Sequence, residues 1–248
     1  VAVANKEPNR DDFEASATEQ PRREQLIDWE AGFEFKKPKY TINANVYYMD
    51  YKDQLVLTGK INDVGAYTRV NVPRSYRAGI ELQVKYALNK YFNSSYNITL
   101  SQNKIEEFTE YIDDYDQFKQ LAIPHKNTNI ALSPSLTMNR IFNWKPNDKL
   151  SFFWTSKYTS RQFLDNTQNK DRILNAFFIN DINAHWTILN KTKFTMLLQL
   201  YANNVFDVQY APNGYTFSYI YDRTLTTSNN FYPMAGRNYW ISLKIDIK

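Results

Sequence analysis

Polar and apolar residues alternate over a long stretch of this chain, from residue 76 to residue 88. One face of the stretch would carry the apolar residues Tyr76, Ala78, Ile80, Leu82, Val84, Tyr86 and Leu88. Successive side chains of a strand point to opposite faces, so this alternation predicts a strand with one apolar face. Thirteen residues exceed the roughly 5–6 of a typical soluble strand. They suit a tilted strand that crosses a bilayer, which needs about 9–11 residues plus some overhang.

Eight further segments alternate in the same way, and the connections between segments have two lengths. The segments cover residues 27–36, 40–48, 96–101, 129–139, 150–154, 182–188, 194–200 and 239–247. Short connections at 37–39, 89–90, 145–148 and 190–191 alternate with long ones at 53–70, 104–126, 160–174 and 203–234. Outer-membrane barrels combine short periplasmic turns with longer extracellular loops, whereas a soluble β-sandwich has no reason to keep every second connection short.

The pattern therefore predicts an all-β fold, a transmembrane antiparallel up-and-down β-barrel. The four long connections would face the outside, and the last segment would end in the periplasm. Within the longest connection, residues 215–221 alternate again, which predicts a small projecting hairpin. Pro134 departs from the pattern, because it falls on the apolar face inside segment 129–139, where it would remove a ladder hydrogen bond.

The composition of the chain excludes several classes of protein. Its 248 residues include no cysteine, which excludes a disulfide framework, a zinc ribbon and a thiol nucleophile. A net charge of +4 predicts no nucleic-acid partner. Aromatic residues make up 16% of the chain although the mean hydropathy is only −0.61. A barrel tolerates this combination, because only alternate residues of its strands meet lipid.

Aromatic residues in two of the long connections are the best candidates for ligand contact. They are Tyr111, Tyr115 and Phe118 in one connection, and Tyr215, Phe217, Tyr219 and Tyr221 in the other. Tyrosine rings can stack on sugars, catechols or porphyrins while their hydroxyls donate hydrogen bonds. The same side chains could instead pack the loops together or form an interfacial aromatic belt.

Two short motifs are typical of strand ends rather than of ligand sites. Their residues are Asn203, Asn204, Phe206 and Asp207 in the first, and Gly236 and Arg237 in the second. In the first motif, the asparagine and aspartate side chains can satisfy backbone groups where a strand ends, with the phenylalanine packed at the rim. In the second, the glycine permits an unusual backbone entry into the last strand, and the arginine could pair with a carboxylate or a lipid headgroup.

The residues that could support catalysis are not arranged for it. His185 shares a face with Asp181, but four residues along one strand separate them too far for direct contact. A Gly-x-Ser-x-Gly nucleophile motif is also missing from the sequence. The acidic residues of connection 104–126 lack the spacing of a calcium loop. We therefore expect no enzymatic activity, no cofactor and no metal site.

Four stretches of the chain resemble the TonB-dependent outer-membrane receptors, especially the Bacteroidota type. They are NKEPNRDDF at 5–13, YKDQLVLTG at 51–59 with SYRAGIE at 75–81, NNVFD at 203–207 with Tyr210, and YPMAGRNY at 232–239. Their order and spacing are similar to the end of such receptors, and the resemblance covers essentially the whole chain. It implies a 22-stranded barrel filled by an N-terminal plug. The nine segments would be its last nine strands, and residues 1–5 the tip of the strand before them.

This resemblance also implies a function. Residues 1–248 would be the C-terminal part of the barrel, without the plug and the early strands, which agrees with the lack of a visible signal peptide. The whole receptor would lie in the bacterial outer membrane and take up a scarce, bulky solute, with TonB acting through the plug. The family favours a ferric siderophore or another iron complex, with a glycan or cobalamin as alternatives. Further implied partners are outer-membrane lipid and lipopolysaccharide, the barrel assembly machinery and a surface lipoprotein.

Two other interpretations remain open on the sequence alone. A small standalone barrel could act as a pore or a hydrolase, provided that 29 kDa is the whole mature protein. A soluble all-β binding module would require Trp29, Trp154 and Trp186 to face a protein core.

Overall fold

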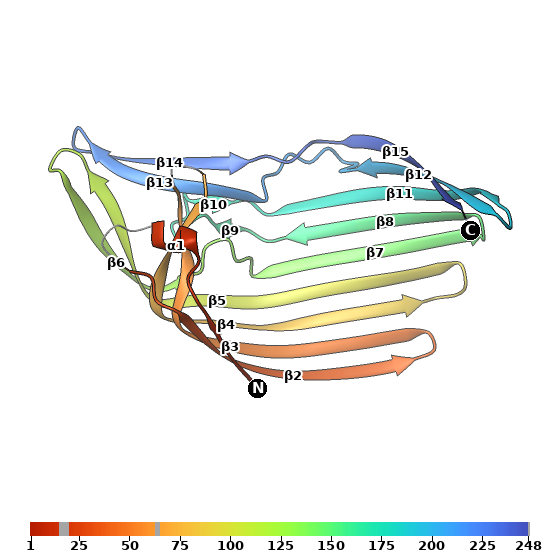
Figure 1. Cartoon of the computed structure of the whole chain (residues 1–248), viewed down its shortest axis with the longest axis horizontal. Coiled ribbons are helices and arrows are strands. Elements are labelled where there is room, and N and C mark those ends of the chain that lie inside the picture. The colour runs from red at the N-terminus through yellow and green to blue at the C-terminus, as the bar shows by residue number, and fades with distance from the viewer. Residues whose placement is uncertain (15–19, 63–64, 248) are drawn as a thin grey trace.

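One curved antiparallel sheet dominates the structure, a computed structural model that describes residues 1–14, 20–62 and 65–247 (Figure 1). Residues 63 and 64 of the predicted connection 53–70, and the last residue, lie outside these ranges. The strands that lie side by side are β1 (Ala2–Lys6), β2 (Glu24–Lys37), β3 (Tyr40–Ile61), β4 (Tyr67–Ala87), β5 (Phe92–Asp114), β7 (Leu136–Asn147), β8 (Leu150–Thr159), β11 (Phe177–Asn190), β12 (Phe194–Asn203) and β15 (Asn238–Ile247).

The remaining elements gather at one end of this sheet (Figure 1). They are α1 (Arg10–Glu14), β6 (Lys119–Asn129), β9 (Gln162–Phe163), β10 (Ile173–Leu174), β13 (Asn213–Tyr221) and β14 (Thr224–Tyr232). β6 pairs with the outer part of β5, and β13 pairs with β14. In the described part of the chain, no helix is long and apolar enough to cross a membrane.

All nine predicted segments contribute strand residues to the sheet. Residues 2–6 form a strand that pairs with β2, as expected for the tip of a preceding barrel strand. The short connections lie at one end, together with the C-terminus, and the long connections lie at the other (Figure 1). The expected up-and-down topology is therefore confirmed, with every neighbouring pair along the sheet antiparallel.

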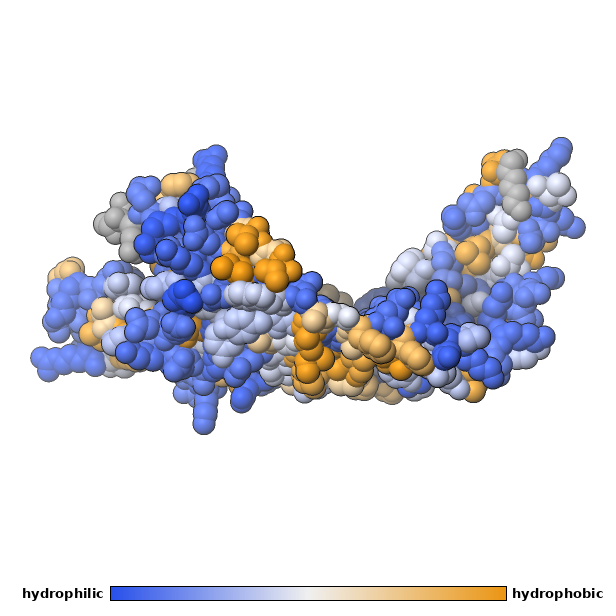
Figure 2. Space-filling model, turned by 90° about the horizontal axis from the view of Figure 1, so that it is seen from below, coloured by the Kyte–Doolittle hydropathy of each residue, from blue (hydrophilic) through white to orange (hydrophobic). Residues whose placement is uncertain are grey.

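The outward face of the sheet carries an apolar band between two aromatic rows. In the outer row, the Tyr48 ring lies 5.8 Å from Trp29 and 5.7 Å from Tyr76. At the turn end, the Trp144 ring packs against Phe92 and Phe152 at 6.2 and 5.1 Å. Figure 2 shows hydrophobic residues concentrated between two hydrophilic ends of the hollowed sheet. A lipid-facing band flanked by aromatic girdles is the surface of a membrane barrel.

The length of β4 between the two rows fits the thickness of a membrane. Tyr76 and Tyr86, both on the apolar face, are ten residues apart. At about 3.3 Å per residue this separation is about 33 Å along the strand. A strand tilt of about 40° reduces it to about 25 Å, the height of the apolar band in outer-membrane barrels.

The structure corrects one feature of the predicted long connections and confirms another. Connections 53–70 and 104–126 are not irregular: β3, β4 and β5 continue through much of them, with 22, 21 and 23 residues, so these strands project beyond the apolar band. The small hairpin expected around 215–221 is present as β13 and β14, joined at the two residues 222 and 223.

The prediction that segment 129–139 is one continuous strand with Pro134 at its centre was wrong. β7 begins only at Leu136. Leu132 adopts a left-handed backbone, with φ of +50°, and its N–H donates to the Phe163 carbonyl at 2.9 Å. Proline has no N–H for the ladder, so the chain leaves the sheet here instead of interrupting it. The neighbouring Ser133 hydroxyl then accepts a hydrogen bond from Arg77.

We predict that a charge on the outward face of β4 destabilises the barrel. Leu82 lies near the middle of the apolar band, so Leu82→Arg is expected to lower the free energy of unfolding by about 2–4 kcal/mol. The adjacent Gln83 points to the opposite face and serves as the control, with a smaller loss expected for Gln83→Arg. Urea unfolding of the native protein in lipid measures both, and equal losses would contradict the assignment of the faces.

Candidate functional site

The outer ends of the strands form a folded layer above the apolar band. Its apolar centre is the cluster of Val56, Val72, Ile105, Phe108 and Ile130, contributed by β3, β4, β5 and the chain after β6. Each of these side chains is buried. Burial of apolar surface therefore stabilises the loops against one another, in the way that it stabilises a small soluble domain.

The β13–β14 hairpin crosses this layer and connects two distant parts of the sheet. It leaves the sheet after β12, yet β13 pairs in parallel with β5 at Tyr219–Asp113 and Ile220–Asp114. The outer ends of β7, β8 and β11 lie between these two attachment points in the order of the sheet. Near its base, the hairpin is held by the Tyr67 hydroxyl, which donates to Asn213 and to the Gly214 carbonyl.

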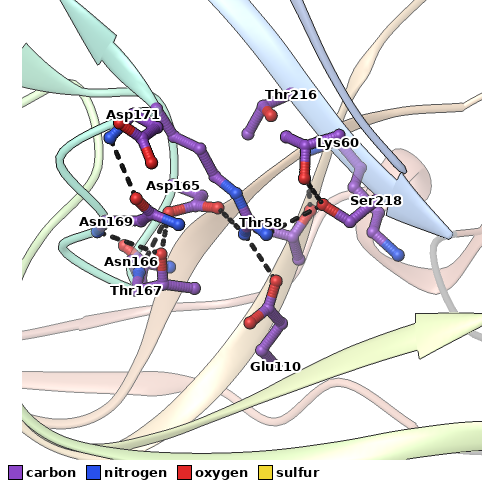
Figure 3. A network of polar contacts seen from close by, with 12 residues as sticks. Thr58, Lys60, Glu110, Asp165, Asn166, Thr167, Asn169, Asp171, Thr216 and Ser218 are labelled. Carbon is purple, nitrogen blue, oxygen red and sulfur yellow. Dashed lines mark hydrogen bonds and ion pairs between the residues drawn. The ribbon is translucent and has the colours of Figure 1, made fainter. Parts of the chain in front are cut away.

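A charge network centred on the buried Arg172 holds three loop elements together, and Figure 3 labels its partners Glu110, Asp165 and Ser218. The Arg172 Nη1 lies 2.5 Å from Glu110 Oε1 on β5 and 2.7 Å from Asp165 Oδ2 in the loop between β9 and β10. Its Nη2 donates to the Ser218 hydroxyl on β13 at 2.8 Å. The other Glu110 oxygen lies 3.3 Å from His125 Nε2 on β6.

The electrostatics of this network favour a permanent charge on Arg172. Burial by itself lowers the pKa of the guanidinium, but the hydrogen bonds to Glu110 and Asp165 outweigh it, so the pKa lies above its ordinary value. The side chain is only 6% exposed. The buried Asp165 and the half-buried Glu110 both pair with this cation, and its loss would remove the arginine partner of both carboxylates.

Asn166, next to the network, fixes the position of its loop. Its side chain is fully buried, accepts a hydrogen bond from the Ala131 N–H at 2.8 Å, and donates to the Leu57 carbonyl at 2.6 Å. Gly59 adopts φ of +89°, and a Cβ atom at this position would lie 2.6 Å from the Asp165 Cβ. Glycine is therefore required where β3 approaches this loop.

Two neighbouring cavities lie among these outer elements. The first, about 470 Å³, is bordered by the Arg172 network and by residues of β3, β4, β5 and β13, among them Lys60, Tyr111 and Phe217. The second, about 510 Å³ and here called the aromatic cavity, is lined by Lys60, Ile61, Asp113, Tyr115, Tyr215, Phe217, Ser218 and Tyr219. Lys60, Phe217 and Ser218 line both, so the two hollows are adjacent.

Five of the seven aromatic ligand candidates line these cavities, although they come from separate connections. Tyr115, Tyr215, Phe217 and Tyr219 border the aromatic cavity, and Tyr111 borders its neighbour. The rings of Tyr115 and Tyr219 meet edge to face at 6.0 Å. The other two candidates do not join them. Phe118 and Tyr221 stand at the hairpin tips and are 92% and 65% exposed.

The sequence did not point to the polar residues of this site. Lys60, Asp165, Arg172 and Ser218 come from three connections and share no spacing that a motif search could use. The only available signal was the acidic character of connection 104–126, which includes Glu110. That signal suggested a solvated loop, because the partner arginine lies 62 residues further along the chain.

The residues of the two strand-end motifs meet at the outer ends of β11, β12 and β15. Asn204, with φ of +49°, donates from its side chain to the Val208 carbonyl, accepts from the Val208 N–H, and its main chain donates to Asp181. Asp207 Oδ1 accepts the main-chain N–H of Arg237 at 2.7 Å. A Cβ atom at Gly236 would lie 2.6 Å from that oxygen.

The surroundings of Asn203, Phe206 and His185 are structural. Asn203 donates to Asn238 at 2.9 Å, and Phe206 is largely exposed. His185 packs against Phe153, with ring centroids 4.9 Å apart, and lies within 3.3 Å of Gln199 Nε2. Asp181 accepts a hydrogen bond from the main-chain N–H of Asn204 at 2.8 Å, not from His185.

Comparison with known proteins gives one family match and several structural neighbours. The family model described as TonB dependent receptor-like, beta-barrel matches residues 22–205. The ferric yersiniabactin uptake receptor FyuA from Yersinia pestis is similar at 16% identity and a TM-score of 0.60, over 88% of this chain and 29% of its own. No curated protein matches this chain.

Two further solved structures share the fold. The ferric-catecholate import receptor Fiu from E. coli K12 is similar over 99% of this chain and 32% of its own, at 12% identity and a TM-score of 0.62. The copper transporter OprC is similar over 99% of this chain and 36% of its own, at 16% identity and a TM-score of 0.65. The chain therefore spans about a third of the length of these receptors.

We predict that Arg172 stabilises the outer layer without stabilising the membrane-spanning sheet. Arg172→Met removes the arginine partner of the buried Asp165 and the half-buried Glu110, and it is expected to lower the local unfolding free energy of residues 160–174 and β13 by about 3–5 kcal/mol. Hydrogen exchange, residue by residue, measures this loss and shows whether the sheet stays protected.

The matched control is Arg74→Met, which breaks the exposed pair with Asp50 and is expected to cost less than about 1 kcal/mol. Combining Arg172→Met with Glu110→Gln and Asp165→Asn removes the buried charges together, and we expect it to restore part of the protection. Equal exchange in the Arg172→Met and Arg74→Met variants would show that the buried network is not stabilising.

Proposed function

This chain belongs to the TonB-dependent receptor family of outer-membrane β-barrels, and from this premise we propose that the whole protein actively takes up a scarce, bulky solute. A ferric siderophore or another iron complex is the solute class that we propose. The names of two structural neighbours, a ferric yersiniabactin uptake receptor and a ferric-catecholate import receptor, support this class by analogy of fold.

The observation that carries the proposal is the grouping of aromatic side chains at the outer mouth of the sheet. Tyr115, Tyr215, Phe217 and Tyr219 come from connections about a hundred residues apart, yet they line one cavity. A barrel wall requires no such cavity above the membrane. A cavity lined by aromatic rings with a few polar groups is the usual form of a small-molecule site.

The chemistry of the two cavities suits a ring-bearing ligand. Aromatic faces of Phe217 and the tyrosines can stack on planar groups, and tyrosine hydroxyls can donate hydrogen bonds to oxygen atoms of the ligand. The Lys60 ammonium, which donates to the Tyr111 carbonyl at 3.1 Å, adds a positive charge at the border between the cavities. Arg172 carries one positive charge and is already paired with the two carboxylates of Glu110 and Asp165, so the network itself has an excess negative charge. Lys60 is therefore the cation at this border that we propose for contact with an anionic group of the ligand.

The remaining parts of the proposed transport cycle follow from the family. TonB would act through a plug that fills the barrel, and residues 1–248 would be the C-terminal part of that barrel. We propose lipid and lipopolysaccharide as the surroundings of the apolar band, the assembly machinery as the factor that inserts it, and a surface lipoprotein as a further partner of the outer loops. The chain would supply wall and ligand contacts and perform no chemistry.

We predict that removing aromatic rings from the cavity weakens uptake. Each stacking contact contributes about 1 kcal/mol beyond buried area, so the double variant Tyr215→Ala with Phe217→Ala is expected to reduce ligand affinity at least tenfold. Uptake of radioactive iron from ferric enterobactin and ferric yersiniabactin by cells under iron limitation is the measurement, with surface expression checked in parallel.

The control variant is Phe118→Ala with Tyr221→Ala, which removes two exposed rings outside the cavities and is expected to leave uptake unchanged. Wild-type cells that import neither iron complex, but depend on the receptor for cobalamin or a glycan, would contradict the iron proposal and retain the transport proposal. Equal uptake by both double variants would show that the cavity does not bind the solute.

A further inference from the structure

The tips of two outer hairpins meet through one carboxylate. Asp116 stands in the turn between β5 and β6, and residues 222 and 223 form the turn between β13 and β14. Asp116 Oδ1 accepts the Asp222 N–H at 2.9 Å, and Oδ2 accepts the Arg223 N–H at 2.7 Å. The two turns are more than a hundred residues apart in the chain, and Figure 1 shows the two hairpins converging at their tips.

The turn of the β13–β14 hairpin needs this acceptor. Asp222 and Arg223 both have positive φ, +48° and +57°, the values of a type I′ turn. Such turns normally contain asparagine and glycine, because other side chains are strained in the left-handed region. The contact with Asp116 orders a turn whose own residues are poorly suited to it.

The opposite turn presents the carboxylate in a fixed position. The buried Asp114 accepts the main-chain N–H groups of Asp116 and Gln117 at 3.0 and 3.1 Å, which shapes the β5–β6 turn. The Tyr115 N–H donates to the Ile220 carbonyl at 3.0 Å and continues the short parallel pairing of β5 with β13. Asp116 is therefore aimed at the other tip by its own hairpin.

The contacts at the tips differ from those along the rest of the β13–β14 hairpin in their exposure to water. Arg172 and Ser218, the latter midway along β13, are buried, and Tyr67 is half-buried against Asn213 at the base of the hairpin. At the tips, Asp116 and its two partners are exposed. Exposed hydrogen bonds compete with water and open at lower free energy than buried ones. Parting of the tips must also break the short pairing of β13 with β5, including the Tyr115 N–H bond to the Ile220 carbonyl. The buried Arg172–Ser218 contact and the Tyr67 contacts can then hold the rest of the hairpin in place.

Separation of the tips would widen the aromatic cavity, because both hairpins contribute to its lining. Asp113 and Tyr115 come from the β5–β6 hairpin, and Tyr215, Phe217 and Tyr219 come from β13. The Tyr115 and Tyr219 rings, in contact across this boundary, would separate with the tips. A solute could then enter between the hairpins and be enclosed when they meet again.

We propose that the two hairpin tips form a gate over the aromatic cavity and that Asp116 is the residue that closes it. The ligand part of this inference rests on the proposed function, since the gate would control access of the transported solute. The opening and closing of the tips are independent of ligand identity and are measured without a ligand.

The first experiment measures the distance between the tips in the full-length receptor. The chain has no cysteine, so Gln117→Cys and Leu225→Cys place one spin label on each hairpin without background. We expect a narrow, short distance distribution with Asp116 present and a broader, longer one with Asp116→Ala. Asp116→Asn, which keeps one acceptor oxygen, is expected to lie between them. Glu106→Ala, an exposed carboxylate on the same hairpin, is the control and should leave the distribution unchanged.

The second experiment measures access to the cavity. Tyr215→Cys is labelled on intact cells with a membrane-impermeant maleimide, with and without Asp116→Ala. We expect the labelling rate to rise at least fivefold when Asp116 is removed and to stay constant with Glu106→Ala. An unchanged distance distribution, or an unchanged labelling rate, in the Asp116→Ala variant would overturn the gate.

A third measurement links the gate to transport. A cleavable bismaleimide that joins the cysteines at 117 and 225 should abolish uptake of radioactive iron from ferric enterobactin or ferric yersiniabactin, and cleavage of the linker should restore it. Full uptake by the joined receptor would overturn the gating role. If wild-type cells import neither complex, the proposed solute is wrong, and the distance and labelling results alone decide whether the gate exists.

Discussion

Within the hydrocarbon of a membrane, water cannot satisfy backbone N–H and C=O groups, and this constraint determines the main features of the chain. The strands of the band must satisfy one another's backbone groups, so they lie side by side in one continuous antiparallel sheet. The outward residues must be apolar, whereas the inward residues are free to be polar, which produces the period of two. Pro134 shows the same constraint in a different way. A residue without an N–H has no place in the ladder, and the chain leaves the sheet just before β7.

Above the apolar band, water returns and the rules become those of a soluble protein. β3, β4 and β5 continue as hairpins that pack around the cluster of Val56, Ile105 and their neighbours. A buried arginine with two carboxylates is acceptable there because each charge has a close partner of opposite sign. The outer layer is thus a small folded unit on top of the barrel wall, stabilised by its own core and its own polar network.

The β13–β14 hairpin is held by buried contacts along its length and by exposed contacts at its tip. Midway along β13, Ser218 bonds to the buried Arg172, whereas the turn at 222–223 bonds to Asp116, which water can reach. The aromatic cavity lies between these two regions, with walls from both hairpins. A receptor that must admit a bulky solute and then retain it needs a stable wall together with a contact that can reopen. In the receptor that we propose, the same hairpin would supply both.

The sequence by itself determined the membrane-spanning part of this protein. Lipid imposes a period of two on every spanning strand, so the alternation at 76–88 and in the other segments predicted the strands, their faces and their order. The family resemblance in the stretches at 51–59 and 203–207 agreed with the family match over residues 22–205. The aromatic candidates of connections 104–126 and 203–234 were also visible, because tyrosine-rich loops differ in composition from simple turns.

Only the tertiary structure decided what those loops form. Long-range contacts set the geometry of the outer layer, and no local period encodes them. Arg172 meets Glu110 and Ser218 across 62 and 46 residues, and Asp116 meets the 222–223 turn across more than a hundred. The alternation of residues 129–135 resembled a strand because Ile130 and Leu132 are apolar. However, Pro134 has no N–H to donate to a neighbouring strand, and Ile130 packs into the apolar core of the outer layer, so these residues do not form a strand. These long-range contacts decide which aromatic rings line the cavity and which lie exposed at the hairpin tips. The residue types alone do not.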